Sequence, residues 1–256
     1  MASGIDHIAI AAADPDAAAV ELTERVGLAF TAGGHHPGLG TFNRIAFLGD
    51  SYLELIGVED ATLAANWAVG AAAVHALEHG GGFATYGLAD DGIRTSVARL
   101  QVNGSSVGPL VAGHRELPDG ERVTWWTAAP PVLGPDKPPF LIKHLYAGAE
   151  WGADALAARR AYVHPIGSPV ILRQLQIATA APQGLAADCY RDVDLEFWEV
   201  ASVAVCSIGP QTIRLVPAAS GRTTVVIGAA VEATRSINAL GVRFEVEPVD
   251  FPLPLA

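Results

Sequence analysis

The chain has 256 residues, half of them hydrophobic, which is enough apolar surface for one large or two small domains. Its formal net charge of −11 argues against nucleic acid, whose phosphates require lysine and arginine, and gives no attraction to an anionic membrane. No apolar stretch approaches the ~18 residues of a membrane-spanning helix, no basic segment precedes an apolar one at the N-terminus, and two cysteines are too few for a disulfide framework, so we expect a cytoplasmic protein.

The first predicted elements lie in residues 5–57. An alternating, β-branched run, IDHIAIA, predicts a strand. The segment after it predicts an amphipathic helix, with Asp14 as N-cap, Pro15 in the first turn and Gly27 at the end. Three short strands follow, FTAGG, TFNRIAFLG and SYLELIGV, and a turn at 49–51 joins the last two. The order of strands and helix is therefore βαβββ.

The same order of elements returns along the chain. Residues 82–146 again predict a strand, a helix and three strands. A third copy begins at 170, with a helix from 185 and the strands FWEVASVAV and QTIRLVPA. A truncated fourth copy consists of the strand TTVVIGAA, a helix VEATRSINALG and the strand VRFEVEP. The alanine-rich stretch 60–79, predicted to be helical, and residues 147–168 are interpreted as linkers.

This tandem array resembles the vicinal oxygen chelate superfamily, which includes glyoxalases, bleomycin-resistance proteins and dihydroxybiphenyl dioxygenases. Three stretches are most similar to its glyoxalase-like domain branch: IDHIAIAAADPDAAA, GGHHPGLGTFNRIAFLGDSYLELIGV and PPFLIKH. The resemblance implies an α+β fold of tandem βαβββ modules whose pairs curl into two half-barrel cups, with the fourth module truncated. We expect the active-site cup in residues 1–150 and a structural third module plus partial fourth in residues 168–256.

Strand alternation predicts which side chains enter the first cup, because neighbouring residues of a strand face opposite sides. If Ile8 and Ile10 face the helix, His7 faces the cup beside small alanines. The same argument gives the other inward residues on the fourth strands: Tyr52, Glu54, Ile56, Phe140, Ile142 and His144. Of the adjacent Trp125 and Trp126, one should face inward.

The resemblance also implies a metal site, since each module of the family places a ligand on its first and fourth strand. His7 and Glu54 match these positions in module one, and His144 matches the fourth strand of module two. The first strand of module two supplies no histidine or glutamate, and Thr85 and Tyr86 are poor substitutes. Two histidines and a carboxylate suit a divalent metal such as Fe, Zn, Mn, Co or Ni, with positions left open for water or substrate.

Two of these residues have plainer interpretations. Glu54 lies in the apolar run GDSYLELIG, and burying an unpaired carboxylate is costly. It therefore needs a cation or hydrogen bonds, for which the adjacent strand offers Thr41, Asn43 and Arg44. His144 is alternatively a strand-end histidine that faces solvent.

Further candidates lie in and after the glycine-rich stretch 33–44. His36 begins its HPGLGT segment and, at the rim of the cup, could carry a proton near pH 7; a loop histidine facing water is the alternative. Asn43 and Arg44 are predicted to bind substrate oxygens. Trp125 is predicted to form an aromatic wall for the substrate, although core packing is the plainer explanation for a tryptophan.

The leading hypothesis is a metal-dependent enzyme that acts on a small oxygenated molecule whose vicinal oxygens chelate the metal, with Glu54 as ligand and base. The resemblance allows lyase, isomerase or dioxygenase chemistry. The alternative is a metal-free protein that binds or sequesters a small molecule or drug, as bleomycin-resistance members do. A third hypothesis is a family member kept for interactions, with a cup filled by apolar side chains. Dimers are common in the family, so a homodimer is compatible with the resemblance.

Overall fold

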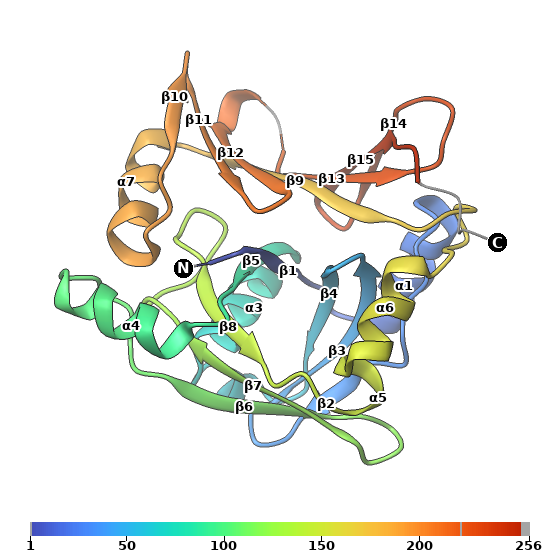
Figure 1. The fold of residues 1–256 in the computed structure, drawn as a ribbon, viewed down its shortest axis with the longest axis horizontal. Helices are drawn as coiled ribbons and strands as arrows, with labels where there is room; N and C mark the ends of the chain where they lie inside the picture. The colour runs from blue at the N-terminus through green and yellow to red at the C-terminus, as the bar shows by residue number, and fades with distance from the viewer. Residues whose placement is uncertain (1, 221, 252–256) are drawn as a thin grey trace.

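The computed structural model describes residues 2–220 and 222–251. Eight strands close into a barrel in the order β1-β4-β3-β2-β6-β7-β8-β5 (Figure 1). The strands are β1 (Gly4–Ala11), β2 (Gly34–His36), β3 (Thr41–Leu48), β4 (Ser51–Val58), β5 (Gly82–Ala89), β6 (Val111–Glu116), β7 (Arg122–Ala128) and β8 (Phe140–His144). The first two predicted modules supply four strands each, so the cup predicted from the sequence is a closed barrel.

The helices pack around the two sheets. They are α1 (Pro15–Arg25), α2 (Ala61–Ala64), α3 (Ala68–Glu78), α4 (Ile93–Val102), α5 (Gly148–Trp151), α6 (Ala153–Ala161) and α7 (Pro182–Val193). Asp14 caps α1 as predicted, because its side chain accepts hydrogen bonds from the backbone amides of Asp16 and Ala17. The expected linker 147–168 contains α5 and α6, which contact β7 and β3. None of the described helices is long and apolar enough to cross a membrane.

The remaining strands form a second, open sheet in the order β10-β11-β12-β9-β13-β15-β14, which lies across one side of the barrel (Figure 1). They are β9 (Ile171–Thr179), β10 (Trp198–Val200), β11 (Val203–Ile208), β12 (Gln211–Pro217), β13 (Thr224–Ala229), β14 (Arg235–Ala239) and β15 (Val242–Pro248). A short 3₁₀ helix, Ala218–Ser220, follows β12. The run predicted as one strand, FWEVASVAV, is a hairpin that turns at Ala201, whose φ is 55°.

The helix predicted over 231–241 is wrong. Part of this segment forms β14, which pairs antiparallel with β15 and turns at Leu240 and Gly241, both with positive φ. Pairing with β14 satisfies backbone groups of β15 that would otherwise be unpaired at the edge of the sheet. The truncated fourth module therefore contributes strands alone.

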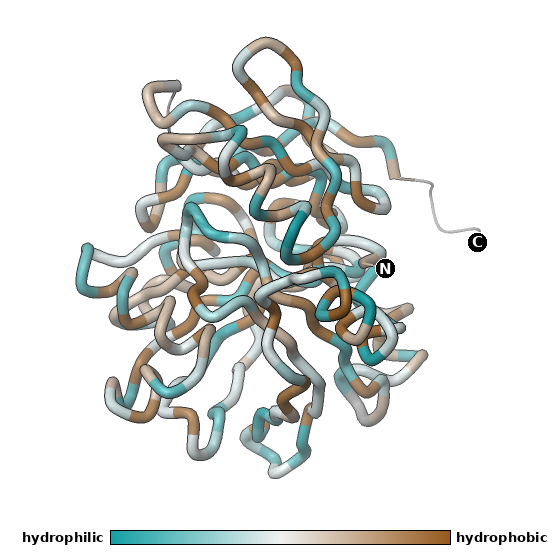
Figure 2. The backbone as a smooth tube through the Cα atoms, turned by 90° about the vertical axis from the view of Figure 1, so that its left-hand side faces the viewer, coloured by the Kyte–Doolittle hydropathy of each residue, from teal (hydrophilic) through white to brown (hydrophobic). Residues whose placement is uncertain are grey.

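The main core lies between the barrel wall and the second sheet. Ile8 and Ile10 belong to a cluster that also contains Leu175 of β9 and Ile227 of β13. The face expected to pack on the helix therefore belongs to a core that includes residues of both α1 and the second sheet. Figure 2 shows hydrophobic residues along the strands of both layers and hydrophilic residues in several outer loops. With β1 packed outward in this way, His7, Ala9 and Ala11 are left facing the barrel interior.

Candidate active site

The barrel interior contains a cavity of about 40 Å³. A water molecule needs roughly 10–15 Å³ by the same measure, so the cavity has room for a few waters or the polar end of a small molecule. Tryptophans from three different segments and polar residues from several strands surround it. The main lining residues are His7, His36, Asn43, Tyr52, Glu54, Trp67, Arg115, Trp125, Phe140, His144 and Trp151.

Glu54 is buried, and its hydrogen-bond partner is Asn43. The amide Nδ2 of Asn43 donates to Glu54 Oε1 at 2.6 Å, and Asn43 Oδ1 accepts from Arg115 Nη1 at 3.2 Å. Arg115 is in turn paired with Glu150 of α5. Arg44, the other candidate, instead pairs with Asp16 of α1 outside the barrel. The predicted substrate-binding role of Arg44 therefore has no support from its position.

Asp6 holds two histidines at the other side of the cavity. Its Oδ1 lies 2.7 Å from His7 Nδ1 and 3.2 Å from His144 Nε2. Burial raises the pKa of Asp6, but His144 and His7 outweigh it through charge and hydrogen bonds, and the pKa falls well below its usual value. Asp6 is therefore ionised and accepts from both rings, which leaves His7 Nε2 directed toward Glu54 Oε2 at 3.7 Å.

These contacts join into one buried polar network across the barrel. It runs through seven residues in the order Glu150, Arg115, Asn43, Glu54, His7, Asp6 and His144. The network contains three carboxylates and one guanidinium, and it links α5 with β6, β3, β4, β1 and β8. Asn43 and Asp6 therefore hold the side chains of Glu54 and His7 in place, and these two side chains meet at the cavity.

Asp6 was not predicted, because strict alternation places it on the opposite face from His7. The pairing of β1 with β5 shifts register between Ile5 and His7. Such an irregularity changes where a side chain points, and Asp6 contacts the same network as its neighbour.

His36 lies in β2 and is buried, not in a rim loop. Its Nδ1 is 2.7 Å from Thr41 Oγ1, and its Nε2 is 3.4 Å from Asn43 Nδ2. Burial lowers the pKa of His36 to about 4, Glu54 raises it in part, and Arg115 lowers it further. The ring is therefore neutral at pH 7, with Nδ1–H donating to Thr41 and Nε2 facing the Asn43 amide. This arrangement makes His36 a support for Asn43 and a poor proton donor.

His144 is buried, so the solvent-facing interpretation is wrong. Its ring stacks on Trp151 with centroids 3.8 Å apart, and its Nδ1 has no hydrogen-bond partner within the described structure. Of the tryptophan pair, Trp125 faces the cavity, whereas Trp126 lies outside under the guanidinium of Arg94.

The three predicted metal ligands do not converge. His7 and Glu54 approach one another, but His144 is held by Asp6, and within the described ranges the ligand atoms of these three residues are not all within 4.8 Å of each other. Zinc-type sites normally have at least three protein ligands around one ion. The donor set in the barrel therefore does not fit the predicted metal.

The strand register explains why the second module adds no ligand. β1 and β5 are both eight residues long, and His7 and Thr85 are each the fourth residue. In module one, Ala9, the sixth residue of β1, pairs with Glu54. In module two, Gly87, the sixth residue of β5, pairs with Phe140, so Phe140 takes the position of Glu54. A side chain at Gly87 would lie 3.0 Å from His7 Cε1 and 2.9 Å from Phe140, so glycine allows these two rings to pack. Thr85 and Phe140 thus replace the second ligand pair.

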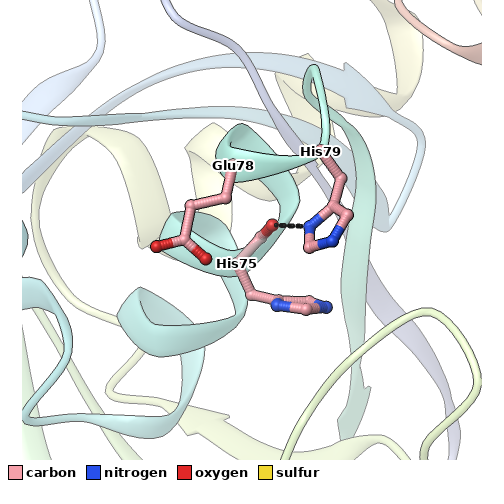
Figure 3. A group of neighbouring side chains, drawn as sticks. All are labelled: His75, Glu78 and His79. Atoms are coloured by element: carbon pink, nitrogen blue, oxygen red, sulfur yellow. Dashed lines mark hydrogen bonds between the residues drawn. The ribbon is translucent and has the colours of Figure 1, made fainter.

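A group that could hold a metal lies instead at the surface, where His75, Glu78 and His79 project from the end of α3 (Figure 3). Their potential ligand atoms all lie within 4.8 Å of one another, and all three residues are exposed. His79 Nδ1 donates to the carbonyl oxygen of His75 at 2.8 Å, which leaves its Nε2 free to bind a cation. The spacing places these residues on neighbouring turns of one helix face.

Further site residues were missed from the sequence, among them Trp67 in the alanine-rich stretch 60–79. Glu150 and Trp151 lie in the expected linker, whose composition gives no sign that it docks on the barrel. Arg115 could have been found, because it shares a strand face with Gly113, which pairs with the inward-facing Trp125.

Residues 5–191 match the family model described as a glyoxalase-like domain, which is most of the chain. The chain belongs to the glyoxalase-like domain family. This confirms the resemblance to the glyoxalase-like branch of the vicinal oxygen chelate superfamily. No match was found among curated proteins.

One solved structure shares the fold of this glyoxalase-like protein, and others are similar over about half of the chain. A hypothetical protein from Staphylococcus aureus is 18% identical, with a TM-score of 0.78, and the alignment covers 96% of this chain and 99% of that one. Methylmalonyl-CoA epimerase from Streptomyces coelicolor, in complex with 2-nitronate-propionyl-CoA, is 19% identical, with a TM-score of 0.42 over 57% of this chain and 99% of that one. The Mycobacterium tuberculosis epimerase is 17% identical, with a TM-score of 0.42 over 56% and 88%.

Proposed function

We propose that the barrel interior is the active site of an enzyme that moves a proton on a small oxygenated molecule. The observation that carries this proposal is the pair formed by Glu54 Oε2 and His7 Nε2, 3.7 Å apart at a cavity of about 40 Å³. Asn43 donates a hydrogen bond to the other carboxylate oxygen of Glu54, Oε1, and Asp6 accepts one from the other ring nitrogen of His7, Nδ1. Both groups are therefore oriented before a substrate binds.

The two side chains have complementary roles in this proposal. Glu54 takes a proton from a carbon atom next to a carbonyl group, and His7 Nε2 hydrogen-bonds to the carbonyl oxygen, where negative charge develops. For Nε2 to donate, His7 carries a proton on both ring nitrogens, and ionised Asp6 accepts the hydrogen bond from Nδ1. Aromatic side chains border the pair, and a bound substrate would displace the remaining water, which strengthens these interactions. The reaction class is isomerisation or epimerisation.

This proposal assigns no step to a metal. His7 and Glu54 would offer two ligands to a divalent ion, and the positions that should complete the set hold Thr85 and Phe140. The 2-His-1-carboxylate arrangement of iron dioxygenases is likewise not assembled by His7, Glu54 and His144. The residues present therefore favour acid–base chemistry over the metal-dependent chemistry predicted from the sequence.

A second candidate function is metal-free binding of a small molecule. Trp67, Trp125 and Trp151 all line the cavity and offer flat apolar surfaces to a ligand. Such a protein would need the aromatic lining but not the acid–base pair. The cavity is not filled by apolar side chains alone, which argues against a family member kept only for interactions.

Deuterium exchange tests the proposed reaction directly. The enzyme would be incubated in D₂O with a panel of small 2-hydroxyketones, 2-hydroxyaldehydes and 2-oxoacids, and NMR would follow loss of the proton next to the carbonyl. We expect exchange for at least one compound, slowed roughly 100-fold or more in Glu54→Gln, because a positioned base contributes on the order of 10²–10⁴. Glu59→Gln, which alters an exposed carboxylate paired with His35, serves as control and should exchange at the wild-type rate.

Equal exchange by wild type and Glu54→Gln would contradict the role of Glu54. Saturable binding of a panel compound without any exchange would instead support the second candidate. Removing the aromatic surface in Trp125→Ala should then weaken binding, whereas Glu54→Gln should leave it intact.

A further inference from the structure

A second cavity, which we call the α6 groove, lies between α6, residues 29–33 and the β6–β7 turn. Its volume is about 630 Å³, within the range of roughly 300–1,000 Å³ that is common for small-molecule sites. The lining is mostly apolar and includes Phe30, Phe47, Leu117, Ala155 and Ala158. The groove shares no lining residue with the barrel cavity, so a ligand could bind there whether or not the proposed function is correct.

Arg159 of α6 lines this groove with a buried guanidinium. The residue is 7% exposed, and its guanidinium carbon lies 4.5 Å from the ring centroid of Phe47 and 4.4 Å from that of Trp151. The two rings hold the planar group in place. Within the part of the chain that the structure describes, its Nε and Nη1 have no hydrogen-bond partner.

Unpaired donors in a buried guanidinium are energetically costly, and most buried polar groups have partners. A guanidinium donates charge-assisted hydrogen bonds to a carboxylate or a similar oxyanion. We infer that the α6 groove binds a small molecule with a carboxylate or another oxyanion on an apolar body. The oxyanion pairs with Arg159, and the body lies along the apolar lining.

The acidic residues near the groove do not oppose this assignment. Asp119 and Glu121 lie at the β6–β7 turn, where solvent screens their charge. Glu150 is already paired with Arg115. None of the three hydrogen-bonds to Nε or Nη1 of Arg159.

Arg159 also borders a smaller cavity of about 230 Å³. That cavity is lined by ionised Asp6, by Asp50 in its pair with Arg160, and by further polar residues such as Gln211, so it offers little apolar surface to the body of a ligand. The apolar α6 groove is therefore the side on which an oxyanion with an apolar body fits.

Isothermal titration calorimetry with octanoate and 1-octanol tests the inference on the full-length protein. The two probes have the same chain length and differ in charge. We expect wild type to bind octanoate at least about tenfold more tightly than octanol, because a hydrogen-bonded charge contributes that much or more. Arg159→Met should lose this preference and bind octanol as before. Arg160→Met, on the next position of α6, changes an exposed residue paired with Asp50 and should behave as wild type.

A groove-filling variant keeps the test decisive if Arg159→Met does not fold, as judged by near-ultraviolet circular dichroism. Ala155→Phe should weaken binding of both probes, because the added ring occupies the α6 groove. The inference is overturned if wild type binds octanoate no more tightly than octanol, or if either Arg159→Met or Ala155→Phe binds octanoate with wild-type affinity.

Discussion

At the scale of single residues, the glutamate within GDSYLELIG is explained by its neighbours. Glu54 is buried, and among the described residues its ion-pair contact is His7, while the Asn43 amide supplies its short hydrogen bond. Asn43 is in turn fixed from two sides by Arg115 and His36. One carboxylate oxygen therefore remains directed at His7, which is what a base in this cavity requires.

His36 predicts a pH dependence of stability. Its pKa of about 4 in the folded protein lies below the usual 6.5, so the unfolded chain binds the proton more readily. The contribution of neutral His36 to the free energy of unfolding is therefore fully present above pH 6.5. It is lost as the pH falls toward 4, which lowers the free energy of unfolding by roughly 3 kcal/mol. Urea unfolding of wild type and His36→Gln at pH 7.5 and pH 4 measures it. The stability difference between the two proteins should shrink or reverse at pH 4; a difference that does not change with pH would contradict a lowered pKa.

At the scale of elements, alternation and turn signals predicted the first module well. The inward faces of β4 and β8 follow from alternation, and the cap at Asp14 and the helix after it follow from the capping residues and the helical spacing. Alternation failed where register shifts, as at Asp6, and local pattern failed where pairing with another strand decides the structure, as in β14. The docking of α5 depends on long-range contacts of Trp151 that no local pattern reveals.

Trp151 tests whether α5 is a docked element or a linker. Its side chain is buried between the ring of His144 and the guanidinium of Arg159. Trp151→Ala should lower the free energy of unfolding by about 3–5 kcal/mol, since it removes a large buried ring. Val163→Ala, at an exposed position of the same segment, should change it by less than about 0.5 kcal/mol. If urea unfolding shows that both variants change the free energy of unfolding by the same small amount, residues 147–168 are a linker and not a docked element.

At the scale of the whole molecule, the barrel and the second sheet share one core. Residues 1–150 and 168–256 were predicted as separate domains, and that division stays a prediction. The shared cluster, with Ile8 and Ile10 against Leu175 and Ile227, predicts that the two sheets unfold together.

Two sets of intrinsic probes can follow the two sheets separately. Four of the five tryptophans lie in residues 1–168, and both cysteines, Cys189 and Cys206, are buried in the second part. Burial raises the thiol pKa to about 12 for Cys189 and about 11 for Cys206, so thiol reagents should react on unfolding. We expect tryptophan fluorescence and thiol modification to give the same urea midpoint. Two well-separated midpoints would show independent domains.

The central claim is that Glu54 is a hydrogen-bonded base and not a metal ligand. Loss of activity in Glu54→Gln fits both roles, so metal content decides between them. Inductively coupled plasma mass spectrometry would be applied to untagged, chelator-free wild type, Glu54→Gln and His79→Ala. The account predicts that Glu54→Gln leaves the metal content unchanged and that any bound divalent ion is lost in His79→Ala, at the surface group on α3. About one ion per chain that disappears in Glu54→Gln and persists in His79→Ala would contradict it.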